Sequence, residues 1–548
     1  MLGAIAILSV PPAQAQQQPG RAGEPARIDE RIQPLPRPAG APPPTSVAPP
    51  PEVAPDIGPA FVLAGVVIEG ATIFPPETFV PLYELLLGTS IRRDGITALL
   101  DAITEKYRAA GYVLSRAVAP VQDVSLGILR VQVLEGYVER VVFEGAPGGA
   151  GLLKAYAERI RSERPLTLAT LERYLLLLAD LPGMSVSAGV APIGEMAAAH
   201  ELLLRVERDP AELFLGFDNR GTATIGRHVG EATLYLNSLF DANEAIMLRG
   251  ITVPATPSEL RFGEVRAQLP LGDDGFTLTM DAWRSAIATG GRLKSLDLDS
   301  EENRVAVAFG YPLRRSRALS LYLGALLEYR DTSQDAAGDR VFQDRTWALR
   351  LGARLFFDDG WGGSNAVYAT LSQGLGLPGA SDKGDARLSR LGGDPQFTKL
   401  VLEMVRRQKI YGPLNLQGWF YGQVSGDSLL SGEEFRLGGG IYGRAYDSSE
   451  VVGEQGVAAA LELQYDLTVA EAVSGLQLFA FYDHGVSWDR VSGSGTFRNA
   501  LSSAGLGTRF RLLERLQVTL EAAKPLNRDV IEEGDRSWRF FFSLGLTF

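Results

Sequence analysis

The side chains that could perform acid–base or metal chemistry are few in this sequence and stand far apart. None of the 548 residues is cysteine, which removes disulfides, thiolate metal sites and a cysteine nucleophile. The only imidazoles belong to His200, His228 and His484. A zinc site or histidine-based catalysis would need long-range folding to bring these together, whereas isolated surface or channel-facing histidines need none. We therefore expect no enzyme activity and no metal site.

Two further segments match ligand-binding patterns only in part. Residues 374–379, GLGLPG, have the glycine spacing of a dinucleotide-binding loop, but a polar loop follows where a helix is required. The acidic cluster between 297 and 302 lacks the glycine and spacing of a dedicated calcium loop, which favours a solvated loop. A formal charge of −12 also argues against binding to phosphate backbones. We expect no cofactor and no nucleic-acid partner.

From about residue 212 onward the sequence has the two-residue period of β-strands. In one such segment the apolar positions are Leu319, Leu321, Leu323, Ala325, Leu327 and Tyr329. The residues between them include Ser320, Tyr322, Gly324, Glu328 and Arg330. No stretch approaches the roughly 20 apolar residues that a membrane-spanning helix needs. The alternation therefore predicts a transmembrane β-barrel of about 16 antiparallel strands, with one face toward lipid and the other toward water.

The connections between these strands alternate in length. We expect short ones at 238–243, 312–318 and 513–514, and long ones rich in glycine, serine and aspartate at 285–301, 374–396 and 426–454. Short periplasmic turns and long outer loops are typical of outer-membrane barrels. The chain ends with Phe540, Phe542 and Phe548 at alternate positions, as expected of an aromatic girdle that closes the last strand. The alternative, a soluble all-β domain, seldom runs so many long strands in one unit.

The first residues have the composition of an export signal followed by a linker. Residues 1–15 form an apolar leader that ends in small residues, although no basic residue precedes the apolar run. Residues 16–56 are rich in proline, which favours extended backbone and cannot build a core. Within this linker, residues 23–32 could form a short helix that docks in or plugs the barrel, or could be a charged part of the linker.

Two small α+β units are predicted between the linker and the barrel. In residues 57–136 a strand at 66–70 is followed by helical spacing from Ile96 to Tyr107 and then by two strands. Residues 137–208 repeat this order of elements. A tandem repeat of this kind indicates a modular arm rather than a single catalytic domain.

Two such units before a barrel of this size resemble the TpsB family of two-partner secretion transporters, relatives of the BamA-type outer-membrane assembly proteins. Residues 107–145 resemble the first POTRA domain of that family, 165–186 the second, and 218–227, DNRGTATIGR, the first barrel hairpin. The resemblance implies two POTRA domains in the periplasm, at 57–136 and 137–208. A 16-stranded barrel at 209–548 would then lie in the bacterial outer membrane.

The more specific part of the resemblance is EEFRLGGGIYGRAYD, 433–447. In the family this loop, here 426–454, folds into the lumen and carries a tip that falls on Gly443, Arg444, Ala445 and Tyr446. Its F-x-D-x-G partner on the inner wall falls on Phe481, Asp483 and Gly485. Strand alternation places Asp483 on the watery face, where the planar guanidinium of Arg444 could reach both carboxylate oxygens. The alternative is that both are ordinary solvated charges. The family often has glycine where this chain has Ala445, and alanine tolerates positive φ poorly.

The resemblance implies a translocase that exports an unfolded partner protein, usually a large adhesin or haemolysin, from the periplasm to the cell surface. The POTRA sheets would offer edge strands to an extended chain, the polar lumen a path, and the inward loop a gate. Expected partners are the secreted protein, outer-membrane lipid and the barrel assembly machinery. Two alternatives remain open: a factor that inserts other barrels, which commonly carries more POTRA units, and a passive pore, which would not need them.

Overall fold

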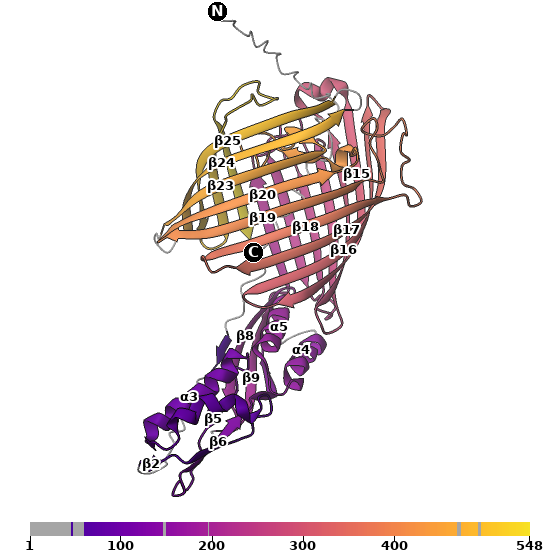
Figure 1. The fold of residues 1–548 in the computed structure, drawn as a ribbon. Helices are drawn as coiled ribbons and strands as arrows, with labels where there is room; N and C mark the ends of the chain where they lie inside the picture. Colours follow the sequence, from indigo (N-terminus) through magenta and orange to yellow (C-terminus); the bar gives the residue numbers. More distant parts are fainter. Residues whose placement is uncertain (1–44, 48–59, 146–149, 195–196, 468–472, 492–494) are drawn as a thin grey trace, which may run out of the picture.

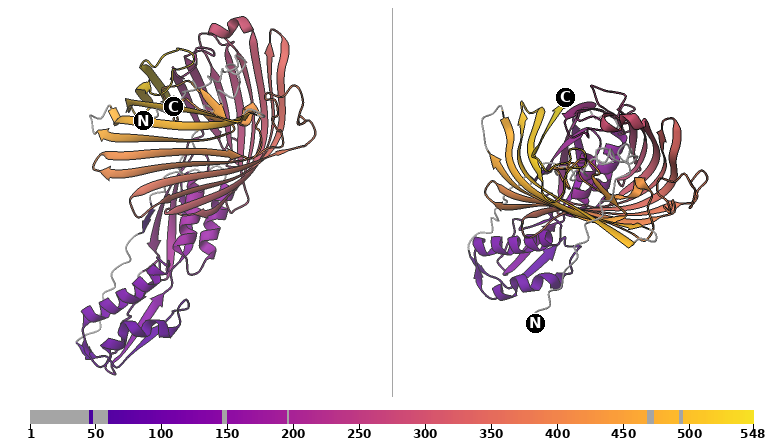
Figure 2. Two further views of the ribbon diagram at one scale, coloured as in Figure 1. Left: turned by 45° about the horizontal axis from the view of Figure 1, so that its top comes forward. Right: turned by 90° about the horizontal axis from the view of Figure 1, so that it is seen from above.

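The computed structural model describes residues 45–47, 60–145, 150–194, 197–467, 473–491 and 495–548. They form a β-barrel from one end of which two small α+β domains extend (Figure 1). The two domains follow one another away from the barrel (Figure 2). The predicted leader and the segment 23–32 lie outside the described residues. Within them, no helix is long and apolar enough to cross a membrane.

The first domain packs one long helix against a small sheet. Helix α3 (Arg93–Ala109) buries Ile96, Leu99 and Ile103 on one face, as its helical spacing predicts. The sheet has the order β3-β6-β5, with β3 and β6 parallel and β5 antiparallel to β6. The other elements of the domain are β2 (Phe61–Val62), β3 (Gly65–Glu69), η3 (Pro76–Phe79), α2 (Val80–Tyr83), η4 (Glu84–Leu86), β4 (Ser90–Ile91), β5 (Arg116–Val118) and β6 (Ile128–Leu134).

The second domain repeats this plan with two helices on its sheet. Helix α5 (Leu168–Ala179) begins at Thr167, whose side chain accepts a hydrogen bond from the backbone N–H of Thr170 at 3.2 Å. It buries a row of leucines against the sheet beside α4 (Ala150–Ser162). The strands are β7 (Tyr137–Glu144), β8 (Met184–Pro192) and β9 (Ala199–Arg208), in the order β8-β9-β7.

Three residues of the proline-rich linker add a strand to this second sheet. Strand β1 (Thr45–Val47) pairs in parallel with β8, with Thr45 opposite Ala188 and Val47 opposite Val190. The composition of the linker predicts extended backbone here but gives no sign of pairing. An edge strand offers its backbone N–H and C=O groups whatever the side chains of the incoming segment, so composition alone does not reveal the contact.

The rest of the chain is a closed antiparallel barrel of 16 strands. They are β10 (Ala211–Asp218), β11 (Val229–Asn237), β12 (Ala245–Thr252), β13 (Leu260–Leu271), β14 (Phe276–Ala288), β15 (Leu298–Arg315), β16 (Leu319–Ala336), β17 (Asp339–Asp358), β18 (Gly363–Leu375), β19 (Thr398–Tyr411), β20 (Leu414–Ser425), β23 (Gln455–Leu467), β24 (Val473–Val491), β25 (Gly495–Leu512), β26 (Leu516–Pro525) and β27 (Arg539–Thr547). Strand β27 pairs with β10 and closes the barrel. The predicted fold class is therefore confirmed.

Two of the predicted connections are shorter than expected. Within 285–301, β14 continues to Ala288 and β15 begins at Leu298, with only the short helix η5 (Gly291–Leu296) between them. At 312–318, β15 continues to Arg315. Polar side chains at these strand ends line the lumen, and Glu302, predicted to be in a solvated loop, is buried in β15 and paired with Arg330 at 3.1 Å. Because lumen-facing positions are polar, composition does not separate them from loops.

Ion pairs join the second domain to turns of the barrel at the end from which the two domains extend. Arg315, at the end of β15, donates to both carboxylate oxygens of Asp180, from Nε at 2.8 Å and from Nη2 at 2.7 Å. Arg173 of α5 donates from Nη2 to Asp274 Oδ1 at 3.0 Å. Contacts of this kind fix the domain in one orientation on the barrel mouth.

Candidate functional site

The connection 426–454, between β20 and β23, folds into the barrel. It contains η6 (Ser431–Glu433) and two short strands, β21 (Phe435–Leu437) and β22 (Val451–Gly453), that pair with each other. Phe435 and Leu437 are buried in one apolar cluster with wall residues such as Phe479 of β24 and Leu501 of β25. The inward loop therefore packs against the side of the barrel formed by β23, β24 and β25.

The turn at the tip of the loop depends on Gly443. Its φ is +94°, and a Cβ at this position would lie 2.5 Å from Cδ1 of Leu501. A side chain is therefore excluded both by the backbone conformation and by space. Ala445, where the resemblance expects glycine, has no positive φ and is fully buried. The alanine is compatible with the turn because the positive φ falls two residues earlier, at Gly443.

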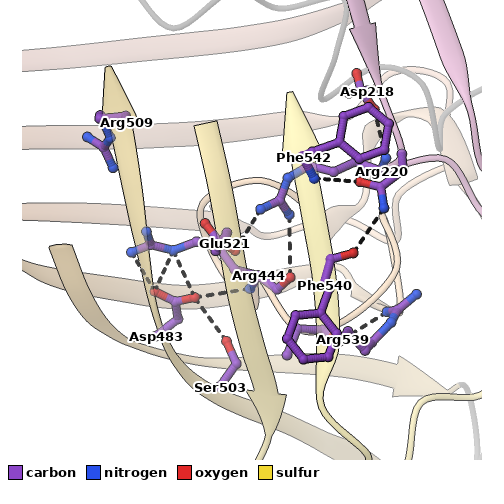
Figure 3. Close-up of polar contacts among 12 residues, drawn as sticks. Asp218, Arg220, Arg444, Asp483, Ser503, Arg509, Glu521, Arg539, Phe540 and Phe542 are labelled. Atoms are coloured by element: carbon purple, nitrogen blue, oxygen red, sulfur yellow. Dashed lines mark hydrogen bonds and ion pairs between the residues drawn. The ribbon is translucent and has the colours of Figure 1, made fainter. Parts of the chain in front are cut away.

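Arg444 and Asp483 form a buried ion pair between the loop tip and β24 (Figure 3). Arg444 Nη2 donates to Asp483 Oδ1 at 3.1 Å, and Nε lies 3.3 Å from each carboxylate oxygen. The backbone N–H of Arg444 and the hydroxyl of Ser503 both donate to Oδ2, at 3.0 and 2.9 Å. Asp483 is 0% exposed and Arg444 5%. A buried carboxylate with this many donors holds Arg444 in one place. Removing Asp483 would leave the buried charge of Arg444 without this partner.

Two further charged residues complete the cluster, and sequence reasoning missed their role. Arg444 Nη1 donates to Glu462 Oε2 at 2.6 Å, and Arg509 Nη2 donates to the other oxygen of Glu462 at 2.8 Å. Two guanidinium groups thus face two carboxylates, so the formal charges cancel. Glu462 and Arg509 stand at inward positions of β23 and β25. Their inward position, which follows from the two-residue period of the strands, was the only sign in the sequence of a role in the cluster. Many other charged residues of the barrel have the same position.

The other wall residues of the predicted motif each contact the loop. The ring of Phe481 lies under the guanidinium of Arg444, with Cζ 3.7 Å from the ring centroid. Gly485 admits the side chain of Leu437, since a Cβ at Gly485 would be 2.6 Å from Leu437 Cδ2. The hydroxyl of Tyr446 lies within 3.2 Å of the carbonyl oxygen of Ser502, where it can donate. The structure therefore brings the predicted tip and the predicted wall residues together.

The base of the loop is anchored on another part of the wall. Glu433 accepts a hydrogen bond from Arg350 Nη2 of β17 at 2.7 Å and pairs with Lys399 Nζ of β19 at 2.7 Å. The loop thus crosses from the β17–β19 wall, which holds its base, to the β23–β25 wall, which holds its tip. Moving the loop out of this position would therefore break charged contacts at both of its ends.

The remaining predicted residues lie elsewhere. Phe540 and Phe548 are exposed on or just after β27, and Phe542 packs beside Phe217 with their ring centroids 5.8 Å apart. None of the three contacts Arg444 in the described part of the chain. His200 is buried in the second small domain, whereas His484 Nδ1 lies 2.8 Å from the hydroxyl of Ser502 in the barrel.

Comparison with known proteins gives matches over both parts of the chain. The family described as haemolysin secretion/activation protein ShlB/FhaC/HecB matches residues 202–510, and the ShlB-type POTRA domain matches residues 61–136. Outer membrane transporter CdiB-2 of Burkholderia pseudomallei (strain 1026b) is 25% identical over 479 residues, which cover 82% of this chain and 77% of that protein.

Two solved structures share the fold. CdiB from Escherichia coli superposes with a TM-score of 0.72 at 20% identity, covering 91% of this chain and 93% of that one. CdiB from Acinetobacter baumannii gives a TM-score of 0.62 at 15% identity, covering 90% of each chain. The fold of this chain is thus shared over nearly its whole length with these two proteins.

Proposed function

Because this chain belongs to the haemolysin secretion/activation family ShlB/FhaC/HecB, we propose that it exports an unfolded partner protein across the outer membrane. It is an outer-membrane transporter of the two-partner secretion type, with its POTRA domains in the periplasm. The observation that carries the proposal is the inward loop, whose tip is held at the wall by the buried Arg444–Asp483 pair.

The POTRA domains would receive the client by main-chain pairing. In the described residues, β3 pairs only with β6 and β7 only with β9, so each leaves one edge to an incoming strand. The outer edge of β8 already carries β1. Strand addition uses backbone groups and tolerates many sequences, which suits an unfolded client. The client class that the family implies is a large adhesin or haemolysin.

The loop would act as the gate of the lumen. With Arg444 bound to Asp483 and Glu462 the loop stays in place, and an entering chain has to displace it. No covalent bond is made or broken in such a cycle. Outer-membrane lipid would surround the barrel, and the barrel assembly machinery would insert it.

The test begins by identifying the client. We would delete the gene and identify, by mass spectrometry, the protein that disappears from the cell surface and accumulates in the periplasm. Arg444→Ala and Asp483→Ala should then lower its release at least tenfold while the barrel still shows heat-modifiable migration on gels. Arg266→Ala is the matched control, because Arg266 also pairs with two lumen carboxylates, Glu264 at 2.7 Å and Asp281 at 3.3 Å, and neither of them shares a partner with the loop. Unchanged release in both Arg444→Ala and Asp483→Ala would show that this ion pair does not control a gate for export.

Deletion of residues 61–208 separates this proposal from its alternatives. A passive pore should keep its permeability to small solutes without the POTRA domains, and a translocase should lose its client. An assembly factor would instead lower the amount of other barrels in the outer membrane. Loss of the one client with normal levels of other barrels is the result expected here.

A further inference from the structure

The seam of the barrel, where β10 meets β27, is its shortest strand pairing. Five residue pairs join the two strands, from Phe214–Thr547 to Asp218–Ser543, whereas the other neighbouring strands of the barrel share at least eight. Fewer main-chain hydrogen bonds make the seam the easiest line along which the wall can part. Side chains that bridge it therefore matter more than they would elsewhere.

The side chain of Asn219 extends this short pairing by one step. Its backbone N–H donates to the carbonyl of Phe542 at 3.4 Å, while its Oδ1, in place of a strand carbonyl, accepts the N–H of Phe542 at 2.8 Å. Its Nδ2 also donates to the carbonyl of Phe540 at 2.9 Å. The amide thus satisfies backbone groups of β27 beyond the end of β10.

The next residue, Arg220, reaches across the seam to the loop. Its Nη2 donates to Glu521 Oε1 of β26 at 2.6 Å, and its Nη1 lies 3.4 Å from the carbonyl oxygen of Arg444 (Figure 3). The guanidinium passes over the ring of Phe541 of β27, with Cζ 4.3 Å from the centroid. One side chain at the end of β10 therefore contacts β27, β26 and the loop tip.

Arg539 makes the corresponding contact from the other side of the seam. It begins β27, and its Nη1 donates to the carbonyl of Ala445 at 3.0 Å, while its Nη2 donates to Asp447 Oδ1 at 2.5 Å. The carbonyls of two consecutive tip residues, Arg444 and Ala445, are thus bound by arginines from the two edges of the barrel. The tip lies between those edges and is tied to both.

We propose that the loop tip, when bound at the wall, holds the seam between β10 and β27 closed. Arg220 and Arg539 are positioning residues that couple the position of the tip to the pairing of these two strands. When the client dislodges the tip, both arginines lose a carbonyl partner and the seam loosens, which widens the lumen for the passing chain. This inference rests on the proposed export function, but it concerns the barrel itself and is measurable without a client.

The experiment is hydrogen–deuterium exchange with mass spectrometry on the full chain in lipid nanodiscs. Asp483→Ala should accelerate exchange in loop peptides covering 438–447 and, at least tenfold, in β10 and β27 peptides, while β16 and β17 stay unchanged. Arg220→Gln combined with Arg539→Gln should accelerate the seam peptides directly. Arg266→Ala, again the control, should leave exchange at the seam as in the unmodified chain.

The outcomes distinguish the coupling of the loop tip to the seam from the gating of export by the loop. The coupling would be refuted if Asp483→Ala exchanged faster in the loop but not in the seam peptides. Unchanged exchange of the seam peptides in the double arginine variant would refute it as well. If the seam is unaffected but Asp483→Ala still abolishes release of the client, the proposed export function stands and only the coupling to the seam is refuted. Faster seam exchange in both variants, with no effect of the control, supports the coupling.

Discussion

At the scale of single residues, the planar fork of Arg444 lets one side chain bind two carboxylates. Arg444→Lys keeps the charge but cannot donate to Glu462 and to both oxygens of Asp483 at once. Each buried acceptor left unsatisfied costs about 1–3 kcal/mol. We expect client release to fall severalfold, measured as the fraction of client in the medium, with barrel folding retained. The control Arg266→Lys should release client normally, and equal loss in both variants would contradict a specific role of the tip.

A second residue-scale prediction concerns Glu135 in the first POTRA domain. Its carboxylate accepts hydrogen bonds from the N–H groups of Thr72 and Ile73, at 2.7 and 3.0 Å, and from the hydroxyl of Tyr107 at 2.8 Å. Burial acts to raise the pKa of Glu135, but these donors together hold it below the ordinary 4.5. A carboxylate with a lowered pKa stabilises the fold at neutral pH, and that contribution is lost as the pH falls below 4.5 toward the pKa of the folded state.

The measurement is thermal unfolding followed by circular dichroism at about 222 nm, a wavelength that reports helix. All the described α-helices lie in the two POTRA domains, so the loss of helix reports on these domains. The barrel strands also contribute at this wavelength, and each transition is therefore compared with that of Glu135→Gln at the same pH. As the pH falls from about 5 to about 3, the unmodified chain should lose helix stability more steeply than Glu135→Gln, which has no charge to lose. If the unfolding temperatures of the unmodified chain and of Glu135→Gln fell in parallel with pH, the Glu135 carboxylate would not be the cause of the acid sensitivity.

The residues of the gate were only partly visible in the sequence. Arg444 and Asp483 could be named because their segments resemble a known family and because alternation places Asp483 inside. Glu462, Arg220 and Arg539 could not, since each is one of many lumen-facing charges. The partner of Arg220 depends on how β10 meets β27, a contact between residues more than 300 positions apart. The partners of Glu462 and Arg539 depend on where the loop tip lies in the lumen. Alternation gives the face on which a residue lies but not its neighbour across the lumen.

At the scale of elements, the seam offers a test by covalent closure. Phe214 faces Thr547 across β10 and β27, next to the hydrogen-bonded pair formed by Leu213 and Phe548. Such non-hydrogen-bonded positions bring Cα atoms to about 4.5 Å, close enough for a disulfide. Because the chain has no cysteine, Phe214→Cys with Thr547→Cys creates a single pair. We expect the oxidised variant to lose client release and to regain it on addition of reductant.

A matched pair distinguishes seam opening from general stiffening. Thr370 and Val401 face each other across β18 and β19, far from the seam. A disulfide between cysteines at these positions should leave release unchanged in both redox states. Normal release from the oxidised seam variant would show that export does not need the seam to part.

Elements as such were predicted better than their ends. The period of two residues revealed the barrel strands because one face of each meets lipid, and the helical period revealed α3 because one face meets a sheet. The strand ends at Ala288 and Arg315 were missed, since polar lumen residues look like loop residues. The pairing of β1 with β8 was missed for a different reason: backbone groups alone make it, and no side-chain pattern records them.

At the scale of the whole molecule, the ion pair between Asp180 and Arg315 sets how the POTRA arm sits under the barrel. Both groups form two parallel hydrogen bonds, and the Arg315 side chain is almost fully buried. Asp180→Arg or Arg315→Asp alone places like charges together and should free the arm, whereas the combined variant restores an opposite-charge pair. We expect client release to fall in each single variant and to recover largely in the double one.

The position of the arm can be measured directly in the same variants. Spin labels on Leu126→Cys in the first POTRA domain and Leu513→Cys in a periplasmic turn are suitable, because both side chains are exposed and no other cysteine is present. The distance distribution between them should be narrow in the unmodified chain, broad in the single charge variants, and narrow again in the double variant. A narrow distribution in the single variants would mean that the other ion pairs between arm and barrel, such as Arg173 with Asp274 and Arg159 with Asp273, suffice to hold the arm. In that case a loss of release would have to come from the client's path rather than from the orientation of the domains.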